Sequence, residues 1–193
     1  MANEIILPDE LVKAARNLER RYQMLRVPSR KIPAAEWDAL PKNIRSVIPD
    51  WIPTLLGNYS LHGGVLEYWN DRKSYARHFS FAQPSDYAYE LAEGEERLEI
   101  LPKSGLVPFG YESDGSMWVT KITDGPSEAI YMLEHTGWGG GEPTLDNGLV
   151  FASRRLSLMF ACMAVSDVSY NEMPGSKTSV LWIKEKPIAQ ARI

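Results

Sequence analysis

Two turn-forming tetrapeptides divide the middle of the chain into short runs of strand-forming residues. Ser113-Asp114-Gly115-Ser116 and Thr123-Asp124-Gly125-Pro126 both contain the residue types that tight turns need. The runs beside them are rich in β-branched and aromatic residues and cover 106–111, 117–122 and 129–133. Because strands joined by short turns pair in antiparallel fashion, the pattern predicts a β-meander.

Two further strands are predicted before the meander. The first, over 65–69, follows Gly63-Gly64. In the second, over 75–81, alternation places Tyr75, Arg77, Phe79 and Phe81 on one face. A short helix over 87–91, opened by Ser85, is predicted next.

The N-terminal region predicts helices. Apolar residues recur every three or four positions over 7–27, which indicates an amphipathic helix that ends before Pro28. Arg16, Arg20 and Arg21 lie off the apolar stripe and are expected in solvent. Five prolines between positions 28 and 53 exclude a long helix there. They favour short helices over 33–40, 41–48 and 50–57.

Toward the C-terminus, the glycine-rich segment 137–141 is expected to be a mobile loop that ends the sheet. The apolar stretch 149–165 predicts a buried helix packed on the sheet, and 179–183 resembles a strand. With no repeat or linker, the expected fold is one α+β domain over 1–193, with a central, largely antiparallel sheet flanked by helices.

Composition restricts the class of protein. The 21 Lys and Arg against 25 Asp and Glu give a net charge of −4, which disfavours direct nucleic-acid binding. The single cysteine, Cys162, excludes an internal disulfide and is expected to be a buried apolar residue. No membrane span or signal peptide is predicted, so a cytoplasmic location is expected.

Motifs that carry chemistry are not found. His62, His78 and His135 have no metal-ligand spacing, and segment 137–141 lacks both the P-loop and the dinucleotide pattern. Glu134 and His135 would point to opposite faces of a strand, which disfavours a catalytic pair. We therefore expect no catalytic residue, no metal and no cofactor.

Aromatic and acidic residues near turns leave two interpretations open. Trp37, Trp51 and Trp118 are expected in the core, whereas Trp69 and Trp138 border turns and suit either a core or a contact role. Glu112 and Asp114 are turn formers, and they could also form an acidic patch with Asp71 and Asp124 at the ends of the sheet.

Two segments carry a family resemblance. The first is Ile48-Pro49-Asp50-Trp51-Ile52-Pro53-Thr54-Leu55-Leu56, followed by Leu61-His62-Gly63-Gly64. The second is Leu106-Val107-Pro108-Phe109, then Asp114-Gly115-Ser116-Met117-Trp118-Val119. In order and spacing they resemble the SMI1/KNR4 superfamily, also called SUKH, over about residues 33–165. The helix 7–27 and the tail 166–193 would be extensions, and 70–103 has no counterpart.

The resemblance implies an α+β fold without catalytic residues and a protein that binds another protein. Many bacterial members are immunity proteins that neutralise a cognate toxin, frequently a nuclease, and fungal relatives are regulatory binding proteins. A cytosolic immunity protein is the leading hypothesis. A regulatory or scaffold module, or a small hydrolase using Asp114, Glu134 or His135, is the alternative. The partner-contact candidates are Tyr68, Trp69, Tyr111, Glu112, Asp114 and Trp138.

Overall fold

The fold combines helices with one antiparallel sheet, as the sequence predicts. The computed structural model describes residues 5–63, 66–69, 76–92, 101–112, 114–123 and 125–165. The helices are α1 (Asp9–Leu25), α2 (Ala34–Asp38), α3 (Lys42–Arg45), α4 (Trp51–Asn58), α5 (Pro84–Ala92) and α7 (Leu156–Val165). The strands are β1 (Leu66–Trp69), β2 (Ala76–Phe81), β3 (Leu106–Glu112), β4 (Met117–Lys121), β5 (Ile130–Leu133) and β6 (Leu149–Ser153).

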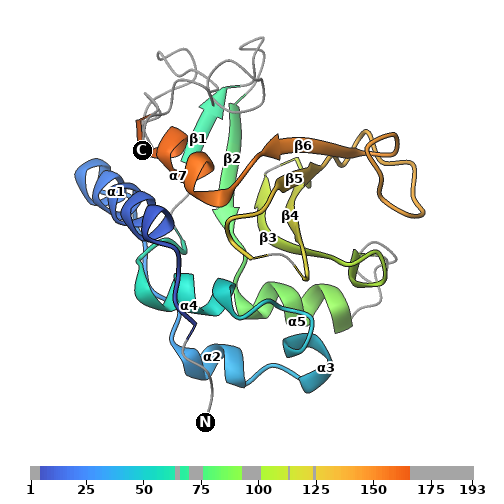
Figure 1. Cartoon of the computed structure of the whole chain (residues 1–193), viewed down its shortest axis with the longest axis horizontal. Helices are drawn as coiled ribbons and strands as arrows, with labels where there is room; N and C mark the ends of the chain where they lie inside the picture. The colour runs from blue at the N-terminus through green and yellow to red at the C-terminus, as the bar shows by residue number, and fades with distance from the viewer. Residues whose placement is uncertain are drawn as a thin grey trace.

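The sheet is a six-stranded meander in which the strands lie in chain order. Every pairing is antiparallel, which confirms the predicted largely antiparallel sheet and the meander of β3, β4 and β5. Among the described strands, β1 and β6 lie at the edges of the sheet. In Figure 1, α1 and α7 lie side by side at one flank of the sheet, and α2 to α5 lie below it.

Prolines set the boundaries of the short helices. Pro33 and Pro41 directly precede α2 and α3, where a fixed φ favours the first helical turn and no backbone donor is lost. Pro53 lies in the first turn of α4, where backbone N–H groups lack intrahelical partners. α1 ends two residues before the predicted end, because Arg26 adopts a left-handed φ of 55° and Val27 N–H closes the helix on the Tyr22 carbonyl at 2.9 Å.

The prediction of a single helix over 149–165 is wrong in its first third. Residues 149–153 form β6, and only Leu156–Val165 are helical. Leu149 pairs with Leu133, so the apolar run extends the sheet before the chain turns at Ser153. A short apolar run carries no periodicity that separates a buried strand from a buried helix.

Two apolar clusters cover the two faces of the sheet. The larger joins one face to the helices and includes Trp37, Trp51 and Trp118, which confirms that these indoles are core residues. The smaller covers the other face beneath Trp138. The predicted strand over 179–183 and the side chain of Cys162 lie outside what the structure describes. Within the described residues, no helix has both the length and the apolar composition needed to cross a bilayer.

Candidate functional site

Most of the predicted contact residues gather at one end of the sheet. Trp69 pairs with Ala76, and Tyr111 pairs with Met117, which also pairs with Leu133. β1, β3 and β5 therefore end where β2, β4 and β6 begin. The backbones of Tyr68, Trp69, Tyr111, Glu112 and Asp114 lie at this end, and Trp138 lies in the loop that leaves it. The side chains of Tyr68 and Trp69 lie outside the described part, as do Asp71 and Asp124.

Glu112 does not belong to the exposed acidic patch that the sequence left open as an alternative. Its side chain is buried, and its Oε1 accepts a hydrogen bond from Trp118 Nε1–H at 2.9 Å. Asp114 has the predicted turn role, because its Oδ1 accepts a hydrogen bond from Ser116 N–H at 2.9 Å. Tyr111 is half-buried against both apolar clusters.

Trp138 is buried rather than exposed. Only 8% of its surface is accessible, and its Nε1–H donates to the Gly141 carbonyl at 3.2 Å. A Cβ on Gly148 would lie 2.5 Å from Trp138 Cβ, so this close packing requires glycine. Gly148 also has a φ of +77°, which favours glycine.

The loop over 134–148 is bonded by side chains, and the sheet continues after it, which corrects the expectation that segment 137–141 ends the sheet. Asn147 Oδ1 accepts from Gly139 N–H at 3.3 Å. Asn147 Nδ2 donates to the carbonyls of Gly140 and Glu142 at 3.0 and 2.9 Å. One amide side chain therefore bonds three loop positions, and the sheet continues beyond the loop into β6.

We call residues 130–153, which comprise β5, this loop and β6, the acidic arm. Leu145 in its loop is 68% exposed, and Phe151 on its edge strand is 46% exposed. The Phe151 ring meets that of Tyr131 edge-on, with centroids 6.1 Å apart. Contiguous apolar surface bordered by polar residues is typical of protein-contact sites, and the contact between Phe151 and Tyr131 makes such a surface on β5 and β6.

The segment that contains this arm carries negatively charged residues and no positively charged Lys or Arg. Residues 122–153 contain no Lys or Arg, and their acids are Asp124, Glu128, Glu134, Glu142 and Asp146. Glu128, Glu142 and Asp146 are exposed. The arm therefore presents apolar side chains among negative charges, an arrangement that favours a basic partner.

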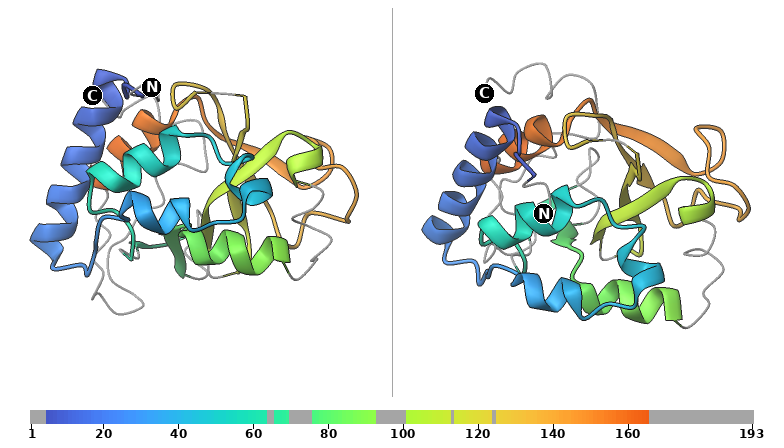
Figure 2. Two further views of the ribbon diagram at one scale, coloured as in Figure 1. Left: turned by 90° about the horizontal axis from the view of Figure 1, so that it is seen from below. Right: turned by 60° about the horizontal axis from the view of Figure 1, so that its bottom comes forward.

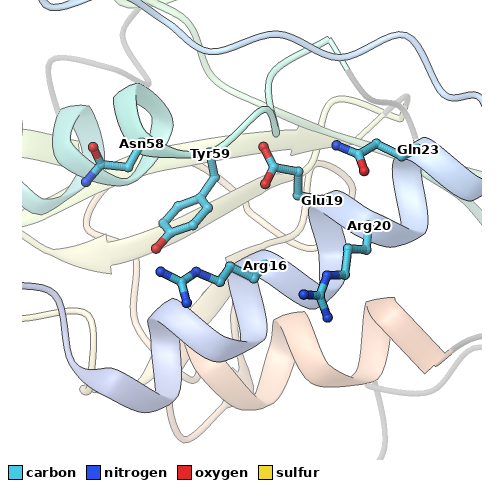
Figure 3. A pocket seen from close by; sticks show the side chains of 6 residues that line it. All are labelled: Arg16, Glu19, Arg20, Gln23, Asn58 and Tyr59. Carbon is cyan, nitrogen blue, oxygen red and sulfur yellow. The ribbon is translucent and has the colours of Figure 1, made fainter.

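A groove of about 590 Å³ lies between α1 and the end of α4. Both views of Figure 2 place these two helices side by side. Figure 3 shows the six lining residues, four from α1 and two from the end of α4: Arg16, Glu19, Arg20, Gln23, Asn58 and Tyr59. Five of them carry hydrogen-bond donors.

The sequence alone does not single out this groove. The sequence feature that points to the groove is the i, i+4 spacing of Arg16 and Arg20, which places both on one helix face. That spacing is equally typical of a solvated surface. The approach of Asn58 and Tyr59 to this face depends on tertiary packing.

Of the residues considered for catalysis, His135 lies against the turn that contains Asp114, and Glu134 lies over Gly137. The Glu134 carboxylate lies over Gly137, where an added Cβ would meet its Oε2 at 2.9 Å. The His135 ring lies against Gly115, with Nδ1 at 3.3 Å from an added Cβ. Among the described residues, no group of three His, Cys, Asp or Glu side chains is arranged to hold a metal ion.

Comparison with models of known protein families, with curated protein sequences and with solved structures found no match to this chain.

Proposed function

We propose that this chain is a cytosolic immunity protein that binds a cognate bacterial toxin and neutralises it by occluding its working surface, without chemical turnover. The acidic arm is the observation that carries the proposal. Its exposed Leu145 and Phe151 provide apolar contact, and Glu142 and Asp146 provide negative charge beside Leu145 in the loop. The family resemblance supports the same class of protein.

The chemistry of the arm favours a basic toxin. A nuclease binds its substrate through a basic surface, because it must neutralise backbone phosphates. An acidic surface is complementary to such a site and would exclude nucleic acid from it. Opposite charge also accelerates association, while the buried apolar residues slow dissociation. An interface of about 800 Å² per partner is the usual size for stable inhibition.

The loop of the arm suits this role because it is held before binding. The bonds from Asn147 and the packing of Trp138 fix the backbone that carries Leu145. A preformed contact loop loses less conformational entropy on association than a mobile one.

The test is co-expression with the product of the adjacent upstream gene. We expect a stable complex and rescue from toxicity, and we expect Leu145→Asp to weaken both. Met24→Asp is the matched control, because Met24 is 71% exposed on α1 and lies outside the arm. No complex and no rescue would refute the immunity function. Rescue that both variants impair equally would refute the assignment to the arm.

Charge reversal tests the electrostatic part separately. Glu142→Lys combined with Asp146→Lys should reduce the association rate by roughly tenfold or more at low salt, with a smaller effect at high salt. Asp38→Lys, an exposed acid on α2, is the control. An unchanged rate in the double variant would remove the arm's charge from the proposal.

A further inference from the structure

We propose that the groove between α1 and α4 binds a small multiply charged anion through phosphate or carboxylate groups. The α1 helix and the loop of the acidic arm lie on opposite sides of the molecule in Figure 1. The groove is therefore a second site, and it does not depend on the proposed toxin contact.

The groove is lined almost entirely by donors. Arg16 and Arg20 present guanidinium groups, while Gln23 and Asn58 present amides. Tyr59 adds a hydroxyl from the end of α4, and Figure 3 shows Arg16 extending toward it. A guanidinium group matches the oxygens of phosphate and carboxylate in geometry as well as in charge.

The one carboxylate in the groove already has a partner. Glu19 Oε1 accepts a hydrogen bond from the backbone N–H of Ser60 at 2.7 Å. This bond joins α1 to the chain after α4, so Glu19 contributes to the shape of the groove. Two guanidinium groups and one carboxylate leave the lining with a net positive charge.

Neither Arg16 nor Arg20 forms an ion pair within the described residues, in contrast to other arginines of this chain. Arg30 binds Glu36 through two hydrogen bonds, and Arg155 binds Glu10 at 3.1 Å. Two unpaired guanidinium groups one helical turn apart repel each other. A bound anion would relieve this repulsion, which is the physical reason to expect one.

The groove has room for more than an isolated ion. Asn58 also lines a second groove of about 390 Å³, whose lining mixes apolar and polar residues that include Ile32, Pro33 and Thr54. A ligand whose anionic group lies between Arg16 and Arg20 could therefore extend past Asn58. This arrangement favours a small organic anion over an inorganic one.

The experiment is isothermal titration of the full chain with inorganic phosphate and, separately, with citrate, both at low ionic strength. We expect saturable binding of at least one probe. Binding of phosphate alone assigns a phosphate-bearing ligand, and binding of citrate alone assigns a carboxylate-bearing one. Binding of both supports a site for either group. Failure of both probes to bind would overturn the proposal.

Variants locate the binding. Arg16→Gln and Arg20→Gln should each weaken it by roughly tenfold, because each removes a charge-assisted hydrogen bond. Glu19→Gln keeps an acceptor for Ser60 N–H but removes the negative charge, so it should tighten binding severalfold. Arg154→Gln, at an exposed arginine outside the groove, is the control for net charge. If Arg154→Gln weakens binding as much as the groove variants, the site is wrong. All variants change partly or fully exposed side chains, and circular dichroism verifies their folding.

Discussion

At the scale of single residues, Tyr22 has a buried polar group whose surroundings do not satisfy it. It is fully buried on α1, and its hydroxyl has no hydrogen-bond partner among the described residues. A buried hydroxyl that loses its water without gaining a partner costs about 1–3 kcal/mol. Burial also raises the pKa of this phenol above its ordinary value of 10.0, because the charged form loses its hydration.

Tyr22→Phe should therefore leave stability at neutral pH unchanged or raise it by about 1 kcal/mol. Above pH 10 the unfolded tyrosine ionises while the folded one stays neutral, so the wild type loses stability by up to about 1.4 kcal/mol per pH unit. The variant lacks this loss, and its advantage should grow with pH. Urea unfolding at pH 7 to 11 measures both effects. A variant that is markedly less stable at pH 7 would show that the hydroxyl has a partner.

Glu112 is also buried, but unlike the Tyr22 hydroxyl its carboxylate has a partner: it accepts a hydrogen bond from the Trp118 indole N–H. Glu112→Ala should lower the free energy of unfolding by about 1–3 kcal/mol, since it leaves a buried N–H without its acceptor. Glu112→Gln keeps an acceptor and should cost less. Thermal unfolding followed by Trp fluorescence compares the two. Equal losses in both variants would contradict this account.

At the scale of elements, the acidic arm shows how a glycine-rich loop acquires one conformation. The loop backbone binds the side chains of Trp138 and Asn147 in addition to its backbone bonds at Thr144. The glycines supply backbone angles that other residues adopt rarely, such as the φ of +88° at Gly140. The two polar side chains then bond to the backbone that the glycines shape.

Asn147→Ala should make the loop mobile without unfolding the sheet. Amide hydrogen exchange of Gly139 should accelerate by tenfold or more, because its N–H loses the Asn147 acceptor. Asp146→Ala, at the exposed neighbouring residue, is the control and should leave the exchange unchanged. Unaltered protection in Asn147→Ala would show that the Asn147 side chain does not order the loop.

The sequence predicted most elements because local chemistry determines them. Pro33 and Pro41 placed α2 and α3, the apolar run between Asp50 and Gly57 placed α4, and Asp-Gly turns separated the central strands. β6 was missed because its residues form a strand only by pairing with β5. That pairing joins segments on either side of a long loop, and it leaves no mark in the local sequence. Trp138 was left open for the same reason, since its burial depends on the approach of Gly148. The groove between α1 and α4 likewise required the packing of two helices.

At the scale of the whole molecule, α1 is part of the central core. Its apolar stripe of Leu11, Ala14, Leu18 and Tyr22 is buried in the larger cluster, and the helix packs along α7. Removal of this helix would expose that cluster, together with the face of α7 that it covers.

A chain that begins at residue 27 should therefore fail to fold cooperatively. We expect a broad thermal transition or aggregation, because burial of each large apolar side chain contributes about 1.5–3 kcal/mol and a domain has only about 5–15 kcal/mol to lose. Calorimetry and size-exclusion chromatography test this. A sharp transition in the shortened, monomeric chain would show that residues 33–165 fold without α1.

The pairing of α1 with α7 also affects how the chain folds during its synthesis. The meander needs only contacts between neighbouring strands, and such contacts form quickly as the polypeptide leaves the ribosome. α1 is synthesised first, but it can pack against α7 only after β6 and α7 have been synthesised. During that interval its apolar stripe is exposed to solvent, which makes the nascent chain a substrate for chaperones until residue 165 has emerged.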